Sequence, residues 1–149
     1  MVGAEKGKKI EISNAEAVDD LAIYSLGTLK NATLRAPNSD AFQKSAGIES
    51  VGKLMREVIG RNEGGKKAQI LLQAAAVIRN VAGNDEAVEI LMRDNVLYLL
   101  IQVLRLYPDH NELVLNIWRF LSKISIQERP RHALFELGVE FVDMALSSL

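Results

Sequence analysis

The segment Asn111–Ser125, NELVLNIWRFLSKIS, decides the fold of this chain. Most of its side chains are apolar and would cover nearly the whole circumference of a helix. The polar residues are spaced so that they fall on one line of a helix with 3.6 residues per turn: Glu112, Asn116, Arg119 and Lys123. A helix that is apolar on all other sides packs between neighbours, so we expect only this line to face water.

The same line recurs in two earlier segments of the chain. In Lys67–Gly83 the equivalent positions are Gln69, Gln73, Ala76 and Asn80, and in Ala15–Thr33 they are Asp20, Tyr24, Gly27 and Asn31. The first residues of the three lines are 49 and 43 residues apart. A helix that recurs at about this spacing, with one polar line in each copy, is typical of a helical solenoid. The sequence therefore predicts an all-α fold.

Composition excludes several classes of protein. The chain has 149 residues, 48% of them hydrophobic and 25% charged, which is enough for a folded domain with a core. Its net charge of −1 gives no general attraction to nucleic acid or to anionic membranes. There is no cysteine, which excludes disulfides and thiolate sites and fits a reducing compartment. Since neither a signal peptide nor a run of about 20 apolar residues is visible, we expect a cytoplasmic protein with no membrane partner.

The helix pattern divides the chain into units of a short helix, a turn, a medium helix, a loop and a long helix. Residues 1–13 are rich in Gly and Lys, and we expect a disordered tail there, followed by a repeat domain over residues 14–149. Ser13 or Asn14 would start the first helix, residues 36–40 would form a loop, and Asn84 or Asp85 would start a later helix. The turns are predicted at left-handed residues, namely Gly47, Asn95 and Gly138.

This unit resembles the armadillo repeat over about Ala15–Leu149. The resemblance rests on the three turns, the apolar helix cores and the sequences LKN and IRN that end at Asn31 and Asn80. It implies a right-handed superhelical armadillo-like solenoid of three-helix repeats, whose third helices line a concave groove. Because the pattern opens on a third helix and closes on a second one, we expect a partial array from a longer protein.

The resemblance also implies where a partner would bind. Peptide-binding armadillo proteins clamp an extended peptide between a Trp and an Asn four residues later. Here the Asn is kept at Asn31 and Asn80 but is Lys123 in the third copy, and the Trp positions hold Gly27, Ala76 and Arg119. Without the aromatic walls a nuclear-import-like peptide groove is only an alternative. The candidate residues for binding an extended peptide or a helix of a protein partner are Asn31, Gln73, Asn80, Asn116, Arg119 and Lys123.

A narrower resemblance suggests a cellular setting. The segment Glu112–Ser125, after the helix LIQVLRLYPDHN, looks like the armadillo repeat-containing protein 2 type of ciliary protein. That family is associated with the assembly of axonemal components, in particular radial spokes, in motile cilia and flagella. The resemblance implies a non-enzymatic scaffold or adaptor. The remaining alternative is a structural array held in a large complex through its convex or end faces.

The motifs that suggest catalysis are weak. Gly60–Lys67, GRNEGGKK, is spelled like a phosphate-binding loop, but Lys67 replaces the Ser or Thr that would hold magnesium, and a helix pattern precedes it. His110 and His132 lack zinc-site spacing, and no serine has a nucleophile-elbow context. The basic clusters lack the aromatics of a single-strand nucleic-acid binder. We therefore predict no enzyme, catalytic residue, metal, cofactor, small-molecule substrate or nucleic-acid partner.

Two large aromatic residues in the opening segment are interpreted as core. Trp118 and Phe120 stand among Leu and Ile, and a partner anchor would need exposure. A fully buried Trp118 predicts that Trp118→Ala costs about 3–5 kcal/mol of stability.

Overall fold

Helices form the whole architecture of the part of the chain that the computed structural model describes, residues 2–62 and 65–149. For residues 2–13 only the backbone is described. This part contains nine α-helices and no strand, which confirms the predicted all-α class. The helices are α1 (Val2–Ala32), α2 (Ala36–Lys44), α3 (Gly47–Gly60), α4 (Lys67–Val81), α5 (Asp85–Arg93), α6 (Val96–Leu106), α7 (Asn111–Ile124), α8 (Glu128–Glu136) and α9 (Gly138–Ser147).

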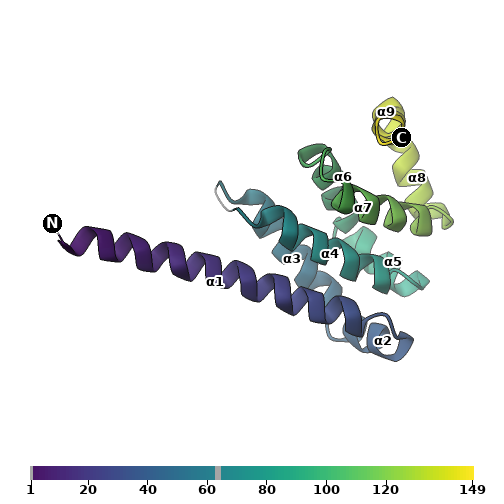
Figure 1. Cartoon of the computed structure of the whole chain (residues 1–149). Coiled ribbons are helices and arrows are strands. Elements are labelled where there is room, and N and C mark those ends of the chain that lie inside the picture. Colours follow the sequence, from purple (N-terminus) through teal and green to yellow (C-terminus); the bar gives the residue numbers. More distant parts are fainter. Residues whose placement is uncertain (1, 63–64) are drawn as a thin grey trace.

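Three helices that carry the recurring polar line lie side by side. α4 packs against α1 on one side and against α7 on the other (Figure 1). α3 packs against α4, and α6 packs against both α3 and α7. α1 runs along one edge of the molecule, and α8 and α9 lie at the opposite edge (Figure 1). The polar line of each long helix is thus brought next to the polar line of its neighbour.

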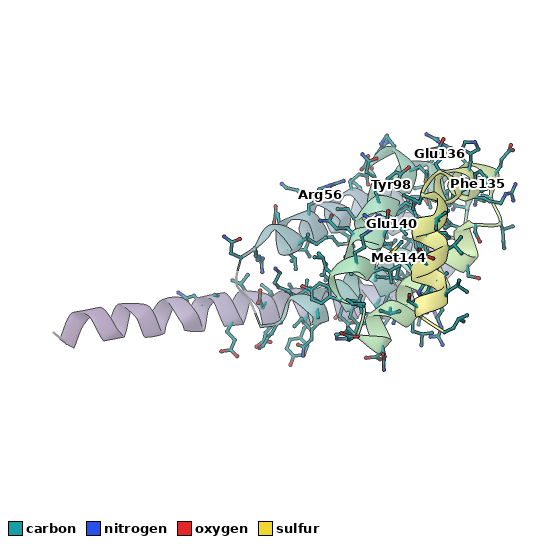
Figure 2. All side chains as sticks on the ribbon, turned by 90° about the horizontal axis from the view of Figure 1, so that it is seen from above. Arg56, Tyr98, Phe135, Glu136, Glu140 and Met144 are labelled. Atoms are coloured by element: carbon teal, nitrogen blue, oxygen red, sulfur yellow. The ribbon has the colours of Figure 1, made fainter. Side chains whose placement is uncertain are left out.

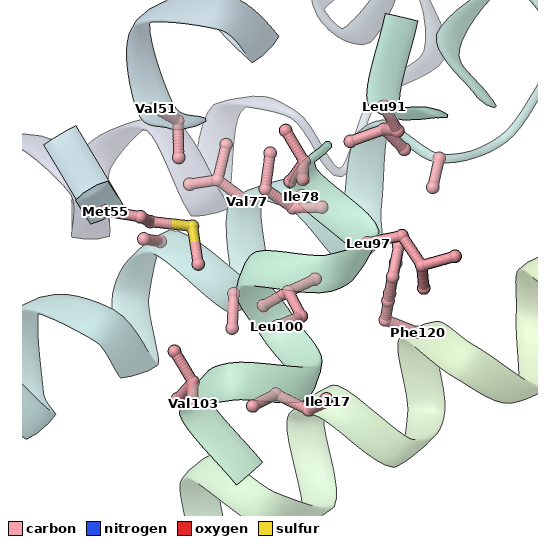
Figure 3. Close-up of a cluster of buried hydrophobic side chains, with 14 of the residues drawn as sticks. Val51, Met55, Val77, Ile78, Leu91, Leu97, Leu100, Val103, Ile117 and Phe120 are labelled. Carbon is pink, nitrogen blue, oxygen red and sulfur yellow. The ribbon is translucent and has the colours of Figure 1, made fainter. Parts of the chain in front are cut away.

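The core lies between the long helices and the medium helices. Figure 3 shows buried side chains of α3, α4, α6 and α7 converging, among them Met55, Val77, Leu100 and Phe120. α4 is buried over most of its circumference because it has neighbours on three sides. It is therefore made of small and medium apolar residues, which allow close helix packing.

The starts of two helices depend on side chains that accept backbone hydrogen bonds. Asn84, predicted as one of two possible caps of α5, accepts a bond of 2.8 Å from the backbone N–H of Ala87. His110 does the same for α7, its Nδ1 accepting from the N–H of Leu113 at 3.3 Å. The predicted loop over residues 36–40 is wrong, because α2 already begins at Ala36. Pro37, in the first turn, needs no N–H partner and has the φ of a helix.

Two of the three predicted left-handed turns are confirmed, and the third is displaced by one residue. Asn95 has a φ of 57° and Gly138 a φ of 61°, whereas in the first unit Ala46, with a φ of 58°, takes this conformation instead of Gly47. Gly47 is needed for space, since a Cβ there would lie 2.6 Å from ring atoms of Phe42. The sequence showed a glycine at the turn but not which of its two properties the fold uses.

The first helix begins at Val2, not at Ser13 or Asn14 as predicted. Lys and Glu are frequent in this segment and are good helix formers, so the helix pattern that starts at Asn14 extends toward the N-terminus. The expected boundary between a tail, residues 1–13, and a repeat domain, residues 14–149, therefore falls inside one helix. No helix in the described part of the chain combines the length and the hydropathy needed to cross a membrane.

Candidate functional site

The six residues singled out from the sequence line two adjoining clefts between the long helices. Most of them line a cleft of about 260 Å³ between α1, α4 and α7, namely Asn31, Gln73, Asn80, Asn116 and Arg119. Asn80 and Arg119 also line the second cleft, of about 280 Å³, where they are joined by Lys123. We call this surface the long-helix clefts. The structure thus brings together residues from three segments that are far apart in the sequence.

Asn80 holds α4 to α1. Its Nδ2 donates to the backbone carbonyl of Lys30 at 2.7 Å and lies 3.4 Å from Oγ1 of Thr33. Its Oδ1 accepts from Nη2 of Arg79 at 3.3 Å. The Lys30 carbonyl belongs to the last turn of α1, where carbonyls lack helical partners. The expectation that Asn80 clamps a peptide backbone has therefore to be revised, because the fold itself uses both ends of its amide.

Polar side chains also join α4 to α7 through hydrogen bonds. Nη1 of Arg79 donates to Oδ1 of Asn116 at 2.6 Å, and Nδ2 of Asn116 donates to the backbone carbonyl of Glu112 at 2.9 Å. Nζ of Lys123 donates to the carbonyl of Arg79 at 3.0 Å, with the carbonyl of Asn80 at 3.5 Å. Lys123 thus lies at the carboxyl end of α4, where the helix carries partial negative charge.

The long-helix clefts carry more positive than negative charge. Lys30, Arg79, Arg119 and Lys123 line them, and the only carboxylate among the lining residues is that of Glu112. None of these four cations forms an ion pair with a carboxylate in the part of the chain that the structure describes. Burial, and then the charge of Arg79, lower the pKa of Lys123 below its ordinary value.

Three of the predicted residues keep polar groups without internal partners. Arg119 and Asn31 are exposed, and neither side chain forms a hydrogen bond to another described residue. Oε1 of Gln73 is buried and accepts no hydrogen bond, and it lies 3.8 Å from the position that a Cβ would occupy at Gly27. Unsatisfied buried polar atoms are rare in folded proteins. Because the side chains of Arg119 and Asn31 are exposed, their polar groups are accessible to an outside partner.

The basic residues around the phosphate-loop-like sequence have internal partners. Arg61 pairs with Asp19 of α1 at 2.8 Å, and Lys66 pairs with Asp20 and Glu16 of α1 at 2.6 and 3.3 Å. Lys67 donates to the carbonyl of Arg61. Residues 63–64 of this motif lie outside the described residues. The helix α3 before the motif and the helix α4 after it give it no strand–loop–helix context.

The histidines and carboxylates do not form a metal cluster in residues 14–62 and 65–149, whose side chains are described, since no group of three or more potential ligands is found there. His110 accepts the N–H of Leu113, as described above. Nδ1 of His132 lies 3.4 Å from Oε1 of Glu136, one turn away on the exposed face of α8. These contacts are typical of helix ends and helix surfaces.

Trp118 differs from its prediction, whereas Phe120 agrees with it. Phe120 is completely buried, but Trp118 is only partly buried. Its Nε1 donates to Oγ of Ser148 at 3.0 Å, and its ring lies 5.6 Å from that of Phe141. It lines a cavity of about 480 Å³ together with Met144 and other residues of α9. The sequence of α7 alone could not show this cavity, because the position of α9 creates it.

No family model, no curated protein and no solved structure matches this chain.

Proposed function

We propose that this protein is a non-enzymatic scaffold or adaptor that binds a protein partner along the long-helix clefts. The observation that carries this proposal is the convergence of residues from α1, α4 and α7 on one surface. These helices pack on a rigid apolar core, so their polar groups are positioned before binding and little ordering is needed.

The internal bonds of the clefts divide their residues into two roles. Asn80, Asn116 and Lys123 join the helices and give the surface its shape. Arg119 and Lys30 present donors toward the partner. A planar guanidinium can bind a carboxylate through two parallel hydrogen bonds, so Arg119 suits an acidic or carbonyl-rich segment of a partner.

We further propose that the recurring short, medium and long helices form an armadillo-like solenoid. The support is that α4 contacts α1 and α7 through equivalent residues, and that Ala46, Asn95 and Gly138 share one left-handed turn. The ciliary setting rests on the resemblance of Glu112–Ser125 to the armadillo repeat-containing protein 2 family. Localisation of the tagged chain to the axoneme of a ciliated cell tests this part of the proposal, and exclusion from the cilium contradicts it.

The binding proposal is tested by capture of partners from ciliated-cell extracts with Arg119→Glu. The matched control is Lys53→Glu, which makes the same charge change at an exposed residue of α3. Arg119→Glu is expected to bind the partner with at least tenfold lower affinity, because one charge-assisted contact contributes about 1.5–3 kcal/mol. Lys53→Glu is expected to keep it, with circular dichroism showing that both variants remain helical. Equal capture by both variants contradicts the assignment of the clefts.

A second candidate function, a structural array held through its end faces, is favoured by one specific observation. Apolar side chains are exposed at both edges of the molecule, on α1 and on α8 and α9. Exposed apolar side chains that gather on one face can serve as an interaction site.

A further inference from the structure

Both edges of the helix layer expose apolar side chains in regular lines. On α1, Leu21 is 68% and Tyr24 73% exposed. With 100° between successive residues, these two lie on the side of α1 opposite to Leu26, which is buried under α4. On α9, Val139, Val142 and Leu146 are exposed at a spacing of three and four residues, which places them on one face.

The inner face of α9 is already occupied. Phe141 packs against Trp118, and Met144 lies in the cavity beside it. Figure 2 shows α9 across one end of the molecule, with Glu140 and Met144 labelled on it and Phe135 on α8 beside it. The apolar face formed by Val139, Val142 and Leu146 therefore faces away from the rest of the chain.

Inside the molecule, one contact occurs twice between successive long helices. Asn80 of α4 donates to the Lys30 carbonyl near the end of α1 at 2.7 Å. Lys123 of α7 donates to the Arg79 carbonyl near the end of α4 at 3.0 Å. The two acceptors, in α1 and α4, are 49 residues apart, and the two donors, in α4 and α7, are 43 residues apart. These are the same offsets as those between the polar lines of these helices.

The two partners of a third such contact are present at opposite edges of the molecule. The next acceptor in the series is the carbonyl of Ser122 in α7, which accepts from Oγ of Ser125 at 3.0 Å. The Lys30 carbonyl likewise accepts from Oγ1 of Thr33 at 3.2 Å. The preceding donor in the series is Asn31 of α1, which is exposed.

An apolar residue of α1 can be compared with the equivalent residues of α4 and α7. Leu21 stands at the position of Ile70 in α4 and Leu113 in α7, both completely buried. In α4, Ile70 is buried because the long helix has neighbours on both sides and α3 beneath it. Leu21 has no such cover within the described chain. Within the described residues no long helix and no medium helix cover the outer side of α1, and α7 and α9 are one long and one medium helix.

We propose that two copies of this chain associate head to tail, with the outer face of α1 in one copy packing on α7 and α9 of the other. Leu21 and Tyr24 then lie against Val142 and Leu146, and Asn31 donates to the Ser122 carbonyl. The contact is heterologous, because it uses a different surface on each copy. Each added copy leaves one α1 and one α9 face open, so association continues into short chains unless the rotation closes a ring.

The test uses single substitutions that each block one side of the contact. Leu21→Asp blocks the α1 face and leaves α9 intact, whereas Val142→Asp blocks α9 and leaves α1 intact. Sedimentation velocity is run from about 1 µM to about 1 mM, a range in which weak interfaces of this kind become populated. The wild-type chain is expected to grow beyond a dimer as its concentration rises. The control Gln102→Asp, which adds the same charge at an exposed residue of α6, is expected to behave like the wild type.

Mixing the two variants gives the decisive result. Each variant alone is expected to stay monomeric, and an equimolar mixture is expected to form a species of twice the monomer mass and nothing larger. If Leu21→Asp alone still forms dimers, the contact joins like faces and the proposal is wrong. A wild-type chain that stays monomeric over the whole range also overturns it. Circular dichroism of each variant verifies that the helices remain intact.

Discussion

At the scale of single residues, the two aromatic side chains of α7 provide a comparison within one turn. Phe120 is completely buried among α4, α6 and α7, so Phe120→Ala is expected to cost about 3–5 kcal/mol of unfolding free energy. Trp118 is only partly buried and packs mainly on α9, so Trp118→Ala is expected to cost about 2 kcal/mol, below the range for a fully buried side chain.

Urea denaturation of both variants, followed by circular dichroism, measures these costs. The expected order is a larger loss for Phe120→Ala than for Trp118→Ala. A reversed order would mean that the contact between Trp118 and α9 stabilises the chain more than the interior of the core does.

Residue types along the polar line were predictable from the sequence, whereas their hydrogen-bond partners were not. The periodicity of Asn111–Ser125 was enough to place Glu112, Arg119 and Lys123 at the surface, and all three are exposed. The bond from Asn80 to Lys30 joins residues 50 apart in the sequence, and it depends on how closely α1 and α4 approach. The local sequence pattern holds no information about that distance. It therefore predicts a binding residue at Asn80, where the structure shows an amide that joins two helices.

At the scale of helices, the sequence correctly predicted helix starts and turns that depend only on neighbouring residues. Asn84 and Asn95 act as the sequence indicates because an N-cap bond and a left-handed residue need only neighbouring atoms. The choice between Ala46 and Gly47 depends instead on the ring of Phe42, which leaves no room for a Cβ at position 47. Position 47 therefore has to be glycine, and Ala46 takes the turn.

The contact of Lys123 with the end of α4 predicts a dependence of stability on pH. Burial and Arg79 lower the pKa of Lys123 in the folded chain, so the charged ammonium costs stability at any pH below that lowered pKa. The cost disappears as the pH rises from the lowered pKa through 10.5, the ordinary value. The unfolding free energy of the wild type is therefore expected to increase relative to that of Lys123→Met over this interval.

Chemical denaturation at a series of pH values measures the difference between the two proteins. Lys53→Met, which removes an exposed lysine of α3, serves as the control for loss of a surface charge. A difference between wild type and Lys123→Met that stays constant up to pH 10.5 contradicts the proposed cause.

At the scale of the whole molecule, α4 determines how the surfaces relate to each other. It contacts α1, α3 and α7. Its polar side lines the long-helix clefts, and its apolar side is part of the core. The all-α class followed from the sequence because amphipathic helices have to bury their apolar stripes against one another. The direction of α9 did not follow, since its apolar residues occur on more than one side, and one of these sides remains exposed.

The proposed functions of the two kinds of surface are separable. Arg119→Glu alters the long-helix clefts, whereas Leu21→Asp and Val142→Asp alter the edges. A chain that assembles head to tail would place the clefts of successive copies in a row and so offer a partner several binding sites at once. Multivalent binding of this kind increases the overall affinity without new contacts.

NMR can show whether the partner binds in the long-helix clefts. Backbone amide shifts of the isotope-labelled chain are followed while the captured partner is added. The largest changes are expected at residues 27–32 of α1, 73–80 of α4 and 112–123 of α7. Changes confined to α2, α5 and α8, with the residues around Arg119 unaffected, would contradict it.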